Sequence, residues 1–298
     1  MNGVNDDMLV LAASITAAFV GLFVLFRKRY RVAPQDPADD APVPVSVRVP
    51  HYSAWRLLSR VPLNIGSDRR AAYRLRFDPE GCLPHWVPGA TAQVYPGQSD
   101  PIASLQPIAR EYPIASLPHE GAIELFVRDE GESSSTWLCA GLAVGQRAAL
   151  WIIANPEFAP PPDDVPLVVI GHGLGIAGQR AYIKARPPGT RNWLIFGEHK
   201  SEFDMLIGPE IADWVATGHL ERCDLVFSRD GLPQRKVSQQ IRDSANPLYD
   251  WVLAGAAIYV CGRQGGFIIG IDRALADVLG EDVLDALRGA GLYKQQSY

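Results

Sequence analysis

The pattern of apolar and polar residues changes at a proline-rich break between Ala159 and Asp164, and this change constrains the fold more than any other feature. Before the break, short apolar or alternating runs recur between glycines and prolines: AAYRLRF, TAQVYP, AIELFVR and RAALWII. Such runs are typical of strands, and no long amphipathic helix competes with them, so they predict a small antiparallel barrel over residues 51–158. A chain of 298 residues has room for this unit and a second one.

After the break, apolar runs alternate with helix-like segments. The order is PLVVIG, a glycine-rich turn, AGQRAYIKA and NWLIFG, followed by the strand candidates LERCDLVFS and AAIYVCG and the closing helices FIIGIDRALADVLG and EDVLDALRGAGL. Strands that alternate with helices indicate βαβ units and a parallel sheet, here over residues 165–298. The predicted fold class is therefore α/β plus β-barrel: an antiparallel barrel followed by a parallel-sheet domain.

The N-terminal segment differs from everything that follows. Met8 to Phe26 contains no charged residue, and RKRYR follows directly. A helix of this length approaches the roughly 30 Å thickness of a bilayer core, so residues 1–31 are predicted to be a transmembrane anchor with a basic flank. Residues 32–50, rich in proline and aspartate, are predicted to be an extended linker.

The charges around the apolar segment set its expected orientation. Basic residues follow it and acidic residues precede it, which by the positive-inside rule places the chain after Arg27 in the cytoplasm of a single-pass inner-membrane protein. A cleaved signal peptide and a buried helix are the alternatives. The sequence lacks the basic start and small-residue cleavage site that a signal peptide needs.

Composition excludes several classes of function. The net charge of −5 comes without a long basic stripe, so nucleic acid is not an expected partner. The four cysteines lie far apart without a CxxC pair, and the six histidines form no HExxH motif. Neither a disulfide framework nor a metal site is therefore predicted.

Three features of the second half mark candidate sites at strand ends. GHGLGIAGQR links a strand to a helix, where glycines and free amides let a pyrophosphate approach, although such turns also occur without a nucleotide. FSRD, with Lys236 and Gln240 after it, offers donors for a ribose phosphate or is only a solvated loop. Cys261 ends a strand where open sheets bind ligands, but buried cysteine is often core filler.

The barrel half contains two candidate flavin motifs. REYPIAS supplies an arginine and a tyrosine, and ESSSTWL supplies a cluster of hydroxyl groups. A flavin pyrophosphate needs cationic and hydroxyl donors, and its ring needs an aromatic partner. Each motif alone is also common in strands and turns that bind no cofactor.

Taken in order, these motifs resemble one family. The succession of arginine–tyrosine motif, hydroxyl cluster, glycine-rich turn, serine–arginine pair, strand-end cysteine and terminal aromatic is similar to that of the ferredoxin-NADP reductase superfamily. It most resembles the FAD- and NADPH-binding half of diflavin reductases such as the sulfite reductase flavoprotein, without the flavodoxin domain. The resemblance runs from about Ala71 to Tyr298 and implies FAD and NADPH as cofactors.

The resemblance also implies roles for individual residues. In the barrel it implies that FAD is held by Arg110, Tyr112, Ser116, Ser134, Ser135 and Thr136. In the second domain it implies that NADPH is held by Gly171, Gly173, Gly175, Arg180, Ser228, Arg229, Lys236, Ser238 and Gln240. Cys261 and Tyr298 are expected beside the nicotinamide and the flavin, as the catalytic pair.

Several positions depart from the family pattern. Pro113 stands in place of a serine, Leu174 of a threonine, Gly178 of a proline, Ser238 of an aromatic residue and Gln296 of an acidic one. The expected function is an NADPH-dependent FAD oxidoreductase that passes hydride to FAD and electrons to a separate acceptor, such as a flavodoxin, a haem protein, a membrane redox partner or a small acceptor such as a free flavin or a metal chelate. The alternative is a weakened flavin- or nucleotide-binding subunit for redox sensing or assembly at the membrane.

Overall fold

The structure is a computed structural model of the whole chain, and it describes residues 50–95, 109–262 and 265–297. The anchor predicted over residues 1–31, almost all of the linker predicted over 32–50, and Tyr298 lie outside the described residues. Within the three described ranges, no helix is both long enough and apolar enough to cross a membrane.

The first half of the chain forms an antiparallel sheet of six strands. They are β1 (Ser53–Pro62), β2 (Ala72–Pro79), β3 (Thr91–Tyr95), β4 (Arg110–Pro113), β5 (Ile123–Arg128) and β6 (Arg147–Ile153), in the spatial order β4-β3-β6-β1-β2-β5. An antiparallel bridge between Ile114 and Leu125 joins the two outer strands and closes the sheet. Buried residues on the inner faces, such as Trp55, Leu57 and Phe77, fill it.

Short turns of helix complete the barrel. They are η1 (Pro118–Glu120), α2 (Ser133–Thr136), the π-helical turn η2 (Trp137–Gly141) and η3 (Pro156–Phe158). The strands predicted from AAYRLRF, TAQVYP, AIELFVR and RAALWII are confirmed as β2, β3, β5 and β6.

The second half forms a parallel sheet of five strands. In the spatial order β11-β10-β7-β8-β9 they are β11 (Tyr293–Ser297), β10 (Ala257–Gly262), β7 (Leu167–His172), β8 (Asn192–Glu198) and β9 (Arg222–Phe227). β8 and β10 are buried along their whole length because helices cover both faces of the sheet. The predicted succession of an antiparallel and a parallel sheet is therefore confirmed.

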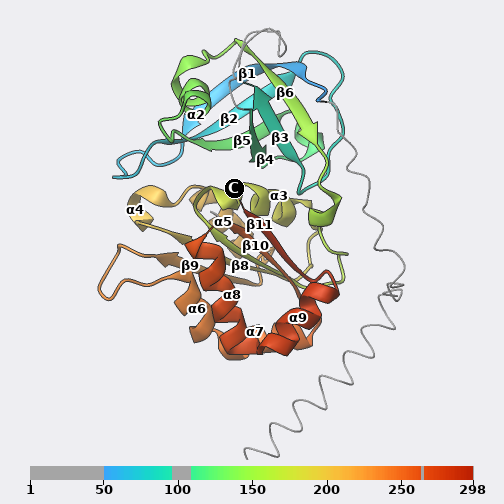
Figure 1. Cartoon of the computed structure of the whole chain (residues 1–298), viewed down its shortest axis with the longest axis vertical. Helices are drawn as coiled ribbons and strands as arrows, with labels where there is room; N and C mark the ends of the chain where they lie inside the picture. Colours follow the sequence, from blue (N-terminus) through green and yellow to red (C-terminus); the bar gives the residue numbers. More distant parts are fainter. Residues whose placement is uncertain (1–49, 96–108, 263–264, 298) are drawn as a thin grey trace, which may run out of the picture.

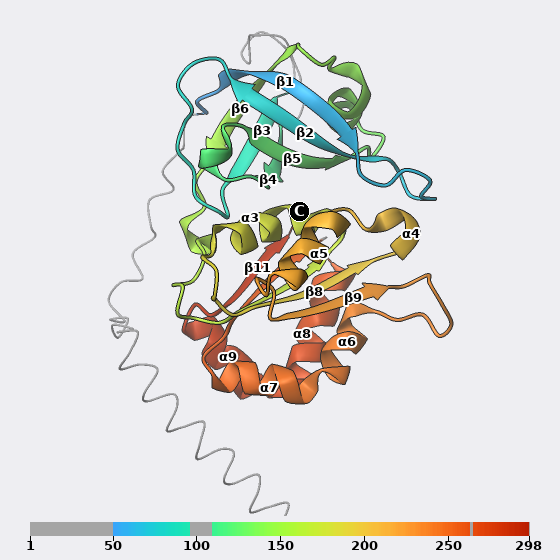
Figure 2. The ribbon, with the colours of Figure 1, turned by 180° about the vertical axis from the view of Figure 1, so that it is seen from behind.

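The helices divide between the two faces of the parallel sheet. Figures 1 and 2 show α3 (Ile176–Ala185) and α5 (Gly208–Ala216) between the sheet and the barrel, together with the short α4 (Ser201–Asp204). On the far face lie α6 (Val237–Asp243), α7 (Ala245–Leu253), α8 (Gly266–Leu279) and α9 (Glu281–Gly289). Ala115 and Phe126 of the barrel belong to the hydrophobic core of the second domain, so the two domains pack against each other directly.

Candidate nucleotide and flavin site

A cavity of about 350 Å³ opens at the carboxyl edge of the parallel sheet, where β8 and β9 end. We call it the basic cavity, because its lining includes Ser228, Arg229, Arg235, Lys236 and Ser238. Four of these five residues were predicted from the sequence, and Arg235 was missed although it immediately precedes Lys236. Carboxyl ends of parallel strands are where α/β sheets bind ligands, and this cationic lining fits an anionic one.

The backbone of the basic cavity continues the pairing of β8 and β9. The N–H of Ser228 donates to the carbonyl of Glu198 at 2.9 Å, and that of Arg229 donates to the carbonyl of His199 at 2.8 Å. These bonds fix where the Arg229 side chain starts, while its guanidinium remains about half exposed. Arg229 is thus held by a rigid sheet edge but keeps access to solvent.

A second cavity, of about 240 Å³, lies between the barrel and the glycine-rich turn. We call it the barrel cavity, and its lining includes Arg69, Arg110, Tyr112, Arg128 and Ser135 from the barrel, with His172 and Gly173 opposite them. Arg110 and Tyr112 are two residues apart on β4 and therefore share a face. The predicted flavin residues Arg110, Tyr112 and Ser135 are brought together here.

The Tyr112 hydroxyl is buried and has no hydrogen-bond partner. Burial raises the pKa of this phenol to about 12, so it stays protonated at neutral pH. A buried donor without a hydrogen-bond partner costs free energy. An unpaired, buried polar group that lines a cavity therefore indicates a position where a ligand binds. Arg110, the neighbouring cation, forms an ion pair with Glu132 at the start of the hydroxyl cluster.

The glycine-rich turn connects β7 to α3 through η4 (Gly173–Gly175). A Cβ added to Gly171 would lie 2.2 Å from the amide oxygen of Gln179, and one added to Gly175 would lie 2.5 Å from the carbonyl of Cys261. Gly173 has a φ of +60°, which favours glycine. Packing and backbone geometry therefore explain these three glycines, whether or not a nucleotide binds.

Cys261 ends β10 between two neighbours in the sheet. It pairs with Gly171 of β7 on one side and with Gln296 of β11 on the other. Its side chain is buried, and this burial raises the pKa of the thiol to about 12. Cys261 is therefore a neutral thiol at physiological pH and is not activated as a nucleophile.

Three of the departures from the family pattern meet at the domain interface. A Cβ on Gly178 would lie 3.4 Å from the Cβ of Pro113 and 3.7 Å from Oε1 of Gln296. Pro113 and Gln296 also line a third cavity, of about 580 Å³, which we call the edge cavity. The edge cavity and the barrel cavity share Glu111 and Pro113, and the barrel cavity shares His172 with the basic cavity, so the three cavities adjoin in this order.

Other predicted site residues bind protein groups instead of lining these three cavities. Ser116 bonds the backbone of Ala122 and Glu124, and the buried Gln240 donates to Asp224 and Ser244. Thr136 donates to Asp129, and Ser134 is buried. Their predicted cofactor contacts stay predictions.

Arg180 is engaged in the same way, and it links the two domains. Its buried guanidinium donates to the carbonyl of Ala115 and pairs with Glu124 of the barrel and Glu210 of α5, at 2.6 to 2.8 Å. This cation therefore connects α3 to the barrel.

His172, Glu198 and His199 bring ligand atoms within 4.8 Å of one another, the spacing of a metal site. However, Glu198 pairs with both Arg69 and Arg128, so its charge is already balanced by two cations. The two guanidinium groups also help burial to lower the pKa of His172 to about 4. A divalent cation would meet the same positive field, so this cluster does not favour a metal.

Comparison with known proteins adds a family to this geometry. No protein-family model matches the chain. It is 32% identical over 223 residues to the sulfite reductase (NADPH) flavoprotein alpha-component of Neisseria meningitidis serogroup B, which is 66% of this chain and 37% of that protein. The protein of the same name from Vibrio vulnificus is 29% identical over 194 residues, 60% of this chain and 32% of that protein.

A similar protein of the same name from Thiocapsa roseopersicina is 36% identical over 141 residues, 45% of this chain and 26% of that protein. The chain covers about a third of the length of these curated relatives. The resemblance to the ferredoxin-NADP reductase superfamily, and within it to sulfite reductase flavoproteins, is confirmed.

Proposed function

We propose that this chain, a relative of the sulfite reductase flavoproteins, is an NADPH-dependent FAD oxidoreductase that delivers electrons to a separate acceptor. One observation carries the proposal: a basic cavity at the edge of a parallel sheet adjoins a barrel cavity that combines Arg110, Tyr112 and Ser135. The relatives are named for NADPH and for a flavin, and these are the two ligands that such a pair of cavities fits.

The barrel cavity fits the requirements of FAD. Tyr112 offers an aromatic ring and a partnerless hydroxyl, and the guanidinium of Arg110 suits a pyrophosphate. At about 240 Å³ the cavity is smaller than most ligand pockets, so the edge cavity that adjoins it would hold part of this large cofactor.

The basic cavity fits the adenosine end of NADPH. The hydroxyl of Ser228 would donate a hydrogen bond to the ribose phosphate, and Arg229 and Lys236 would neutralise its charge. The turn from Gly171 to Gly175 would bring backbone amides toward the pyrophosphate, as strand-to-helix turns do in nucleotide-binding sheets.

When bound, the nicotinamide and the flavin supply the hydride chemistry. The protein's part is to orient both rings at the interface and to keep water away from them. Cys261 would contribute a small neutral thiol beside the ring edge, because burial keeps it protonated. Tyr298 is proposed to cover the flavin, as the resemblance implies.

The electron acceptor is proposed to be a separate molecule. The relatives are each named as one component of sulfite reductase, which implies a partner for them. For this chain we propose a flavodoxin, a haem protein or a membrane redox partner. The apolar run from Met8 to Phe26 favours a membrane-associated acceptor, with the chain anchored in the inner membrane and both domains in the cytoplasm.

A weakened redox-sensing or assembly subunit is the second candidate function. Pro113 and Gln296 lie where the family has a hydroxyl and a carboxylate, and they face the same small region beside Gly178. Loss of groups that position or relay protons lowers a rate by about 10²- to 10⁴-fold. Such a protein would bind both cofactors but transfer hydride slowly.

An anaerobic NADPH titration of the purified full chain, followed by flavin absorbance, tests both candidates. The reductase is expected to be yellow and to bleach quickly, whereas bound FAD that NADPH cannot reduce would favour the weakened subunit. Colourless protein that cannot be reconstituted with FAD would contradict both.

Nucleotide selectivity is tested by Arg229→Ala. Loss of a charge-assisted contact should weaken NADPH binding by about 10- to 100-fold and leave NADH binding unchanged. Arg191→Ala is the matched control, because Arg191 is a similarly exposed arginine that pairs with Glu221 just before β8 and β9 begin, at the opposite end of the sheet. Equal affinity of wild type and Arg229→Ala for NADPH would contradict the phosphate assignment.

A further inference from the structure

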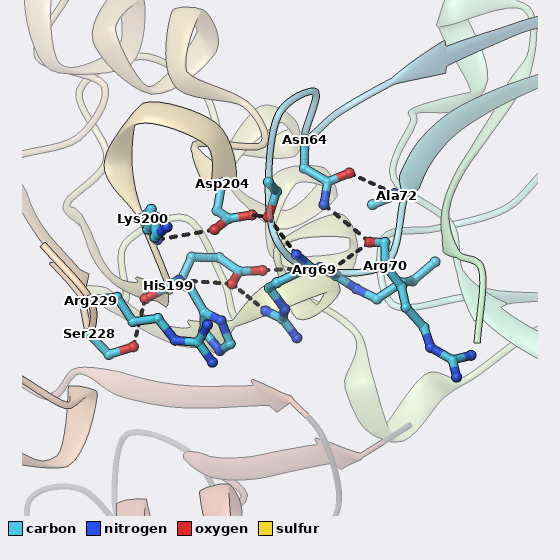
Figure 3. Close-up of polar contacts among 12 residues, drawn as sticks. Asn64, Arg69, Arg70, Ala72, His199, Lys200, Asp204, Ser228 and Arg229 are labelled. Atoms are coloured by element: carbon cyan, nitrogen blue, oxygen red, sulfur yellow. Dashed lines mark hydrogen bonds and ion pairs between the residues drawn. The ribbon is translucent and has the colours of Figure 1, made fainter. Parts of the chain in front are cut away.

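The loop between β1 and β2, residues 63–71, reaches from the barrel to the second domain. Gly66 has a φ of +84°, and a Cβ there would lie 2.9 Å from the ring of Phe203. Ser67 donates to the buried carboxylate of Asp204 at 2.7 Å. Figure 3 shows this loop against the segment that follows β8.

The loop itself is held rigidly. The side-chain amide of Asn64 donates to the carbonyl of Arg70 at 3.1 Å, and its oxygen accepts from the N–H of Ala72 at 2.7 Å (Figure 3). Arg69 pairs with Glu198, whose side chain is buried. A residue between Ser67 and Arg69 is therefore fixed in place by contacts on both sides.

That residue is Asp68, and it reaches the basic cavity. Its carboxylate accepts from the guanidinium of Arg229 at 2.9 Å and lies 3.7 Å from the ammonium group of Lys200. Arg229 lines the basic cavity and is the arginine assigned above to the ribose phosphate. A carboxylate of the barrel thus pairs with the cation that the phosphate would use.

We propose that Asp68 is a specificity-determining residue of the basic cavity, where it competes with the 2′-phosphate of the nucleotide for Arg229. Binding of a 2′-phosphorylated ligand exchanges one anion for another on the same guanidinium and brings the phosphate close to a fixed negative charge. Asp68 therefore weakens binding of phosphorylated adenosine ribose and leaves ligands without the 2′-phosphate unaffected. The inference rests on the proposed nucleotide function.

The size of the effect follows from the setting of the ion pair. Asp68 and Arg229 are 47% and 45% exposed, so solvent screens their attraction and the pair itself is weak. The repulsion between Asp68 and a doubly charged phosphate adds to the competition. Removing the charge should tighten phosphate binding by about threefold to tenfold at low ionic strength.

Calorimetric titration of the full chain with 2′,5′-ADP and with 5′-AMP measures this competition. Asp68→Asn is expected to bind 2′,5′-ADP about three- to tenfold more tightly than wild type, and 5′-AMP as wild type does. Asp68→Glu keeps the charge and should retain the wild-type affinities. The control is Glu221→Gln, which removes one charge from an equally exposed arginine pair far from the cavity, Arg191 and Glu221 at 42% and 45% exposure.

A second experiment removes Arg229, the cation for which Asp68 and the phosphate compete. In an Arg229→Ala background, Asp68→Asn should have a smaller effect, because Asp68 and the phosphate would no longer compete for one cation and only their direct repulsion would remain. The inference is overturned if Asp68→Asn leaves 2′,5′-ADP affinity unchanged, tightens both ligands equally, or acts fully without Arg229. Failure of the wild type to bind 2′,5′-ADP at all would overturn the proposed function as well, so the two failures are distinguishable.

Discussion

At the residue scale, Tyr112 combines a partly buried ring with a buried hydroxyl that has no partner. Without FAD, replacing it by phenylalanine removes an unsatisfied buried donor and should raise the free energy of unfolding by about 1 kcal/mol. Urea unfolding of the flavin-free protein checks this. Tyr112→Ala, by contrast, removes the ring that packs on the barrel core and should lower both stability and FAD affinity. A destabilised Tyr112→Phe would mean that the hydroxyl has a partner in solution.

His172 lies between the basic cavity and the barrel cavity and should make stability depend on pH. Burial, with Arg69 and Arg128 nearby, lowers its pKa from 6.5 to about 4. Between about pH 6.5 and 4, the unfolded state therefore binds a proton on His172 that the folded state does not bind. The free energy of unfolding falls as the pH drops through this range. The full loss amounts to about 3 kcal/mol.

His172→Gln should flatten this part of the curve of unfolding free energy against pH, as measured by urea unfolding at each pH. The exposed His119→Gln is the control and should retain the wild-type curve. Since burial also lowers the pKa of His199, some dependence should remain in the His172 variant. Identical curves for wild type and His172→Gln would show that His172 is not protected from protonation.

The candidate site was predictable from the sequence where its residues are adjacent in the chain. Ser228, Arg229 and Lys236 follow one apolar strand, and the end of a strand in an α/β sheet is where ligands bind. Asp68 and Arg69 could not be found this way, because they reach the site from 161 and 129 residues away in the chain through a loop of the barrel. No local pattern marks such a contact.

At the element scale, the glycine-rich turn owes its composition to neighbouring elements. Gly175→Ala places a Cβ 2.5 Å from the backbone carbonyl of Cys261, and that carbonyl is fixed in β10. The strain should lower the free energy of unfolding by about 1 to 3 kcal/mol. Gly178→Ala is the matched control in α3, since its nearest contact is 3.4 Å.

In α3 alanine is the better helix former, so Gly178→Ala should be neutral or slightly stabilising. Thermal unfolding of the two variants separates these effects directly. A tolerated Gly175→Ala would mean that the turn can move away from β10, and the packing reason given for this glycine would be wrong.

The elements predicted most accurately are those with long apolar runs. β8 and β10 are buried throughout and β7 is buried up to its last residue, and the sequences of all three were read as strands. β11 was missed because YKQQS is polar and short, and only its place beside β10 makes it a strand. The helices α6 and α7 were also missed, since their boundaries depend on packing against α8 and, for α6, against the sheet. The π-helical turn η2 was missed too, and it packs against α2 and β5 of the barrel.

At the scale of the whole molecule, polar contacts join the two domains around a buried carboxylate. Glu198 of β8 pairs with Arg69 and with Arg128 of the barrel, the latter at 3.2 Å, while Arg180 of α3 bonds the barrel from the other direction. The shared core at Ala115 and Phe126 lies at the same interface. We therefore expect the domains to unfold together, in one cooperative transition.

Glu198→Gln tests how far that cooperativity depends on the buried charge. The substitution keeps the size of the side chain but leaves Arg128, itself buried, without its counter-charge, which should cost about 3 kcal/mol. Urea unfolding followed by tryptophan fluorescence should show a lower midpoint and, as the interface loosens, a separation into two transitions. Glu80→Gln is the control, because Glu80 also pairs with two arginines, Arg56 and Arg147, but on the exposed surface of the barrel. It should change the midpoint far less, and an equal effect of both variants would mean that burial of Glu198 contributes nothing to holding the domains together.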